Sequence, residues 1–287
     1  MMCPMTAFRT GLLEPRLGHD MTKIYDRPEV CETYFFPQPN RPLPTRDLAG
    51  PLDLHLAGGT RIGCYWSRPL PGAPTILYLH GNGECIADQL NHWPDWARRA
   101  GANIFFVDYP GYASSDGEPT FTSCCQTAAT ALEHLLAHEE RDVPGVVLMG
   151  RSVGSIFALD AAAQTSSPRL RGLALESGIA DLKPRVDMRV PYEQVGIDRG
   201  AIHAELDQDF NHERKMRTLN CPVLILHTRH DSLVPSWNSQ KLAEWADNKL
   251  HRLVLFEDGD HNDIQWINGS DYQDHLTDFL ASMSPGR

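Results

Sequence analysis

Residues 145–164 read GVVLMGRSVGSIFALDAAAQ. The first six residues are almost entirely apolar, which predicts a strand covered on both faces, and the last ten are rich in Ala and predict a helix. Between them stands the sequence GRSVG, residues 150–154. A G-x-S-x-G between a strand and a helix is typical of a turn so sharp that small residues are needed two positions before and after the serine. Ser152 is therefore a candidate nucleophile, and the alternative is a serine that merely begins a helix.

Seven further apolar runs surround this segment, and stretches with helical spacing, such as residues 126–138 and 239–247, separate several of them. Strands that alternate with helices predict an α/β fold with a mostly parallel eight-stranded sheet flanked by helices. The first two runs are joined by AGGT, which predicts an antiparallel pair at the start of the sheet. The seven runs are LDLHL (52–56), RIGCYW (61–66), PTILYLHG (74–81), NIFFVDY (103–109), GLALES (172–177), PVLILHT (222–228) and RLVLFED (252–258).

The length of 287 residues fits one large domain or two small ones. Residues 1–50 include a proline-rich stretch and are expected to form an extended N-terminal lead-in, and residues 51–287 are expected to form the sheet domain. Within it, residues 182–219 are too long for a plain loop and predict a small helical cap inserted between two strands. Met21 offers an alternative start, which would make residues 1–20 a flexible leader.

The composition excludes several classes of function. A net charge of −11 without a cluster of Lys or Arg argues against binding to nucleic acid or to an anionic membrane surface. The seven cysteines are odd in number and scattered, so neither a disulfide framework nor a zinc site is expected, and a cytoplasmic location is favoured. No apolar run is long enough for a membrane span, and a lone Cys3 is not expected to provide a stable membrane anchor.

A serine hydroxyl needs a base, and the base needs a carboxylate that orients it. Asp231 follows the apolar run at 222–228, and His261 follows the run at 252–258, so both lie where parallel strands end and ligands bind. Taken singly, Asp231 could cap the next helix and His261 could be an ordinary loop histidine. Their occurrence together in the order nucleophile, acid, histidine favours a catalytic role. Glu176 also ends a strand and is the rival acid, but we prefer Asp231.

An oxyanion that forms during attack on a carbonyl needs preorganised N–H donors. One candidate is the backbone N–H of Val153, directly after the serine. The other is the backbone N–H of Asn82, in the stretch LHGNGE at residues 79–84. Gly81 and Gly83 would let this loop turn inward without a side-chain clash. The alternative interpretation is a simple glycine turn.

Together with DYPGYASSDGEPT (108–120), these segments resemble, in order, the signatures of the α/β-hydrolase superfamily over residues 35–280. The stretches HGN (80–82) and HNDI (261–264) are most similar to its soluble serine-hydrolase branch, which includes depalmitoylating protein thioesterases and related esterases. The resemblance implies the roles of nucleophile, acid and general base for Ser152, Asp231 and His261. It also implies oxyanion donors at Asn82 and Val153, and neither a metal nor an organic cofactor.

Two departures from that branch disfavour membrane-bound protein depalmitoylation. The depalmitoylating members carry an N-terminal cysteine cluster, whereas this chain has only Cys3, and Ala113 stands where glycine is more usual. The expected function is hydrolysis of esters or thioesters of small acyl substrates through an acyl-enzyme. The alternatives are a peptidase or amidase, for which Glu84 could hold the substrate amine, and a catalytically silent binding protein. The apolar residues of 182–219 either line an acyl pocket or pack the cap onto the core.

Overall fold

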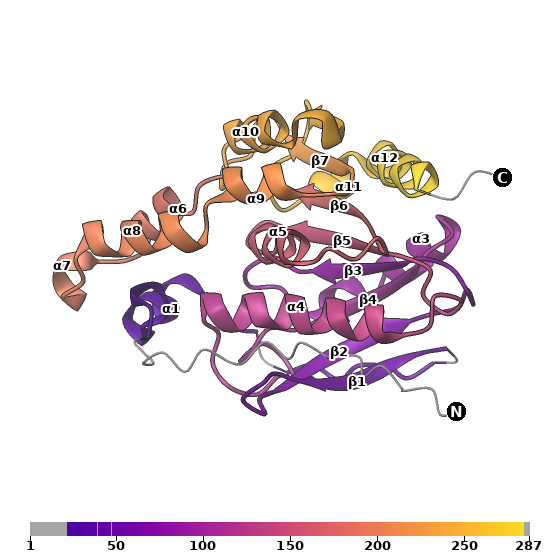
Figure 1. Ribbon diagram of the computed structural model, residues 1–287, viewed down its shortest axis with the longest axis horizontal. Helices are drawn as coiled ribbons and strands as arrows, with labels where there is room; N and C mark the ends of the chain where they lie inside the picture. The colour runs from indigo at the N-terminus through magenta and orange to yellow at the C-terminus, as the bar shows by residue number, and fades with distance from the viewer. Residues whose placement is uncertain (1–21, 39, 47, 284–287) are drawn as a thin grey trace, which may run out of the picture.

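The computed structural model describes residues 22–283 except residues 39 and 47. Its eight strands form one sheet in the order β1-β2-β4-β3-β5-β6-β7-β8 (Figure 1). The pairs β1–β2 and β2–β4 are antiparallel and the other pairs are parallel, so the predicted sheet is confirmed, including its antiparallel start. The strands are β1 (Ala49–His55), β2 (Arg61–Ser67), β3 (Thr75–Leu79), β4 (Asn103–Val107), β5 (Val146–Arg151), β6 (Leu170–Glu176), β7 (Val223–Thr228) and β8 (Leu250–Phe256).

Helices cover both faces of the sheet (Figure 1). Within the part of the chain that the structure describes, none of them is both long and apolar enough to cross a bilayer. The helices are η1 (Ile24–Asp26), α1 (Pro28–Tyr34), α2 (Ile86–Gln89), α3 (Trp93–Arg99), α4 (Phe121–Ala137), α5 (Gly154–Gln164), α6 (Lys183–Asp187), α7 (Tyr192–Val195), α8 (Arg199–Asp209), α9 (His212–Thr218), α10 (Trp237–Ala246), η2 (Asp247–Lys249), α11 (Ile264–Ile267) and α12 (Gly269–Ser282).

The core is split by the sheet into two apolar layers. Successive side chains of a strand point to opposite faces, so in β3 Leu77 and Leu79 pack with α4 and α5, while Ile76 and Tyr78 pack with α3 and α12. Both faces of the central strands are buried, which explains why their sequences are continuously apolar instead of alternating. The reactive residues must therefore lie at the strand ends and not on the faces of the sheet.

The N-terminal segment differs from the extended lead-in expected for residues 1–50. Its described part contains η1 and α1, and Tyr25, Val30 and Tyr34 are buried in the core. The Tyr34 ring lies 4.7 Å from that of Phe121 at the start of α4. Helices this short gain most of their stability from such packing and leave little periodicity in the sequence. Cys3 and residues 1–20, which carry two further predictions, lie outside the described residues.

Residues 182–219 contain the four helices α6 to α9, which lie between β6 and β7 in the chain. In Figure 1, α6, α7 and α8 extend beyond the sheet on the side where α1 lies. Val190, Ile197 and Ile202 are buried in the same core layer as α4 and α5. For these three residues the structure favours packing onto the core over lining a pocket.

Candidate active site

Ser152 lies on the turn between β5 and α5. Its φ of +52° is in the left-handed region, which a residue with a side chain rarely adopts and which costs conformational energy. The Ser152 N–H donates a hydrogen bond of 2.9 Å to the carbonyl oxygen of Glu176 at the end of β6. The turn is thus tied to the neighbouring strand, which holds the serine in its strained conformation.

The two glycines of the motif leave no room for a side chain. A Cβ on Gly150 would lie 2.5 Å from the carbonyl oxygen of Gly154. A Cβ on Gly154 would overlap the carbonyl oxygen of Leu79 and lie 2.7 Å from that of His80. The carboxyl end of β3 is therefore pressed against the serine turn. This close contact brings the loop that follows β3 beside Ser152.

The structure brings together the three residues that the sequence predicts as nucleophile, base and acid. His261 Nε2 lies 2.9 Å from Ser152 Oγ, and His261 Nδ1 lies 2.8 Å from Asp231 Oδ2. The residues follow three different strands, β8, β5 and β7. Ser152 is 9% exposed and the other two are buried. A hydrogen-bonded path thus runs from a buried carboxylate through an imidazole to a hydroxyl that is almost completely buried.

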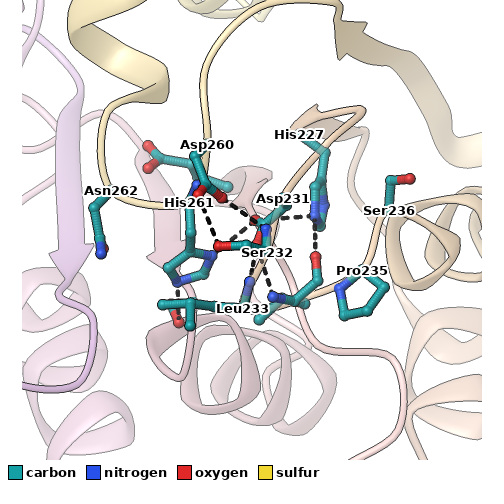
Figure 2. A network of polar contacts seen from close by, with 12 residues as sticks. His227, Asp231, Ser232, Leu233, Pro235, Ser236, Asp260, His261 and Asn262 are labelled. Atoms are coloured by element: carbon teal, nitrogen blue, oxygen red, sulfur yellow. Dashed lines mark hydrogen bonds and ion pairs between the residues drawn. The ribbon is translucent and has the colours of Figure 1, made fainter.

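Asp231 is held as a carboxylate by donors on both of its oxygens (Figure 2). Oδ1 accepts hydrogen bonds from the N–H groups of Leu233 (2.9 Å) and Val234 (2.7 Å). Oδ2 lies 2.8 Å from His261 Nδ1 and 3.3 Å from His227 Nε2. Burial alone would raise the pKa of Asp231, but the hydrogen bonds from His227, His261 and Val234 together lower it below its ordinary value. The group therefore stays ionised beside the imidazole.

Glu176, the rival acid, is engaged elsewhere. Its Oε1 accepts a hydrogen bond of 2.9 Å from Arg151 Nε. Its Oε2 accepts one of 2.8 Å from Gln265 Nε2 and another from the Tyr272 hydroxyl. No bond joins its carboxylate to His261 in the described residues. Of the two candidate carboxylates, Asp231 is the one that faces the imidazole.

Asp260 links the acid loop to the histidine loop, a role that sequence reasoning missed. Its Oδ1 accepts hydrogen bonds from the N–H groups of Ser232 (2.6 Å) and His261 (2.7 Å), and its Oδ2 accepts one of 2.7 Å from Ser232 Oγ. Figure 2 shows Asp260 between Ser232 and His261. The sequence shows only a second aspartate beside His261, and nothing in its spacing points to a partner 28 residues earlier.

The predicted oxyanion donors lie at the serine turn and in the loop after β3. Among the described residues, the backbone N–H groups of Asn82 and Val153 donate no hydrogen bond to the protein. The Asn82 side chain is fixed: Oδ1 accepts from the Phe36 N–H (2.9 Å) and the Tyr112 hydroxyl (2.7 Å), and Nδ2 donates to the Tyr34 carbonyl (2.6 Å). The N-terminal segment therefore braces this loop, a contribution that the sequence did not reveal.

Glu84, considered above as an anchor for a substrate amine, is already paired. Its Oε1 forms an ion pair with Arg151 Nη1, and its Oε2 accepts a hydrogen bond of 3.0 Å from the Gly81 N–H. The side chain of Glu84 is 21% exposed. A carboxylate with both oxygens occupied by the protein has little capacity left for a substrate ammonium group.

Comparison with known proteins identifies the architecture. No family model matches the sequence. The chain is 25% identical over 276 residues to Uncharacterized protein YfhR of Escherichia coli K12, and the aligned region covers 90% of both chains. It is 25% identical over 244 residues to Alpha/beta hydrolase domain-containing protein WAV2 of Arabidopsis thaliana, which covers 81% of this chain and 78% of the relative.

Solved structures show the same arrangement of elements. The esterase Pf2001 of Pyrococcus furiosus superposes with a TM-score of 0.65 at 14% identity, over 86% of this chain and 97% of the other. Alpha/beta hydrolase domain-containing protein 10 from mouse superposes with a TM-score of 0.58 at 18% identity, over 82% and 100% of the two chains. The chain therefore has the α/β-hydrolase fold, as the resemblance implies.

Proposed function

We propose that this protein is a serine hydrolase that cleaves ester or thioester bonds of small acyl substrates through an acyl-enzyme. The observation that carries the proposal is the hydrogen-bonded path from Asp231 through His261 to Ser152, on a strained left-handed turn. Strain stored at one residue and a buried, oriented imidazole are features expected of an activated nucleophile. Neither is needed for a serine that only begins a helix.

In the proposed reaction, His261 Nε2 takes the proton of Ser152 Oγ as Oγ attacks the acyl carbonyl. Asp231 keeps the other imidazole proton on Nδ1, so that Nε2 is free to accept. The N–H groups of Asn82 and Val153 stabilise the oxyanion. The alcohol or thiol then leaves with the proton from His261. Water enters by the same route, attacks the acyl-enzyme and releases the carboxylic acid and the serine.

Two alternatives receive less support from the structure. A peptidase or amidase would need an anchor for the substrate amine, and Glu84, the candidate for that role, is paired with Arg151. A silent binding protein would have no need for an imidazole hydrogen-bonded to a serine on a strained turn. One solved structure with this fold bears the name esterase, which agrees with ester cleavage. The six cysteines of the described residues are free, in keeping with the proposed cytoplasmic location.

Labelling with a fluorophosphonate probe tests the proposal. We expect one adduct on the wild-type protein by intact mass and none on Ser152→Ala, with Ser236→Ala as a control serine on the acid loop that still labels. Active protein would then be screened on p-nitrophenyl esters of increasing chain length, acyl thioesters and aminoacyl amides. Folded wild-type protein that takes up no label would refute an activated serine, and a preference for the amides would refute the ester or thioester class.

A further inference from the structure

The residue directly before the nucleophile, Arg151, has its side chain inside the protein. It is 6% exposed although it carries a charge, and it ends β5 at the point where the serine turn begins. Burying a guanidinium is costly unless its N–H groups are paired with acceptors. The partners of Arg151 therefore indicate what the buried charge accomplishes.

Those partners lie at the ends of three different strands or in the loops that follow them. Nε donates to Glu176 Oε1 (2.9 Å) at the end of β6, and Nη1 is paired with Glu84 Oε1 in the loop after β3. Nη2 donates to the His261 carbonyl (2.8 Å) and to Asn262 Oδ1 (3.2 Å) after β8. Four of the five N–H groups of a guanidinium are thus used inside the protein. Arg151 is therefore unsuited to binding an anionic substrate.

Three of the four bonds of Arg151 lead to the backbone at, or one residue from, a proposed reacting group. Glu84 accepts the Gly81 N–H (3.0 Å), one residue before the proposed oxyanion donor Asn82. The carbonyl that Nη2 binds belongs to the proposed base, His261, itself. The carbonyl of Glu176 accepts the N–H of Ser152 (2.9 Å).

The packing at Gly81 shows how closely these parts fit together. A Cβ on Gly81 would lie 2.6 Å from Arg151 Nη1, so the guanidinium fills the space that a side chain would need. The second carboxylate oxygen of Glu176, Oε2, accepts hydrogen bonds from Gln265 in α11 and Tyr272 in α12. The cluster therefore has little freedom to rearrange, and a shorter or unforked side chain at position 151 could not reach Glu84, Glu176 and the His261 carbonyl together.

We propose that Arg151 is a positioning residue, which fixes the distances between Ser152 Oγ, the imidazole of His261 and the N–H of Asn82. The inference rests on the proposed function and deepens it. A planar guanidinium with a fork of donors spans Glu176, Glu84 and His261 at once, whereas a lysine ammonium provides one point of contact. Displacing reacting groups by about 1 Å lowers the rate about 100-fold without removing any of them.

The test compares Arg151→Lys with Lys215→Met. Lys215 forms a largely buried ion pair with Asp160, and Asp160 lies about two turns of α5 beyond Ser152. Lys215 makes no contact with the proposed catalytic residues. We expect kcat of Arg151→Lys on a p-nitrophenyl ester to fall about 100-fold with KM nearly unchanged, and its fluorophosphonate labelling to slow equally. Lys215→Met should lose stability but keep kcat. The kcat of Arg151→Met should fall at least as far as that of Arg151→Lys.

If Arg151→Lys does not fold, Glu84→Gln decides, because it weakens the ion pair while an amide oxygen can still accept the Gly81 N–H. A folded Arg151→Lys or Glu84→Gln with wild-type kcat, or a loss of kcat matched by Lys215→Met, overturns the positioning role alone. The proposed function and the inference are overturned together if the wild-type protein is not labelled, or if the Ser152→Ala variant is labelled as strongly as the wild type.

Discussion

Replacing Asp231 by Asn should invert the proton arrangement of His261. Oδ1 of Asp231 accepts two backbone N–H groups, from Leu233 and Val234, so the carbonyl oxygen of an asparagine must take that position. Its NH₂ group then stands where Oδ2 lies now, 2.8 Å from His261 Nδ1. A donor at this place obliges Nδ1 to accept, and the imidazole proton moves to Nε2. Nε2 then faces Ser152 with a proton and cannot act as the base.

The expected magnitude has two parts. For the Asp→Asn change in the Ser-His-Asp triad of serine proteases, kcat falls about 10⁴-fold because of the wrong tautomer, which corresponds to about 5.5 kcal/mol. The NH₂ group would also meet the N–H of His227, whose Nε2 lies 3.3 Å from Oδ2 and 2.8 Å from the Val234 carbonyl. Losing a hydrogen bond to a charged acceptor there should cost about 1–3 kcal/mol of folding stability.

The assay is kcat/KM on a p-nitrophenyl ester, with Ser152→Ala as the floor and urea unfolding as the measure of stability. We expect Asp231→Asn to remain folded, to lose stability within that range and to approach the floor in activity. A folded Asp231→Asn protein that keeps more than about a tenth of the wild-type rate would refute the argument, because the tautomer would then not control the base.

Three further changes test other parts of the structure. Gly154→Ala should lower the free energy of unfolding, measured in urea, by about 1–3 kcal/mol or more, because the new Cβ would overlap a backbone carbonyl. Gly58→Ala, with open space around it, should not lower it, and equal losses in the two variants would contradict the packing. Burial raises the pKa of Asp108 to about 7, so protonation of this carboxyl favours folding. As the pH rises from 4 to 7, the stability of the wild type should therefore fall by about 3 kcal/mol more than that of Asp108→Asn, and parallel pH profiles would disprove this. Asp260→Ala should lower kcat about tenfold in a folded protein, because the loop that carries His261 is then no longer bound to Ser232. An unchanged kcat would show that the hydrogen bonds of Asp260 are not needed for activity.

The sequence alone determined the sheet and the order of the candidate residues. Each strand is a local apolar run, and burial on both faces of a central strand can be recognised within six or seven residues. The turn at Ser152 is also local, since its two glycines and the flanking strand and helix lie within 20 residues. Because parallel strands end at one edge of the sheet, the positions of Asp231 and His261 along the chain were sufficient to predict that they meet there.

Only the tertiary structure decided which polar groups pair. Glu176 ends a strand and Asp231 follows one. The sequence could not show that Arg151 and Tyr272 bind the first carboxylate while His261 faces the second. The link that Asp260 makes between Ser232 and His261, and the helices of residues 24–34, were missed for the same reason. Their stability comes from contacts with residues distant in the chain, and such contacts depend on strand order and side-chain reach, which no local pattern encodes.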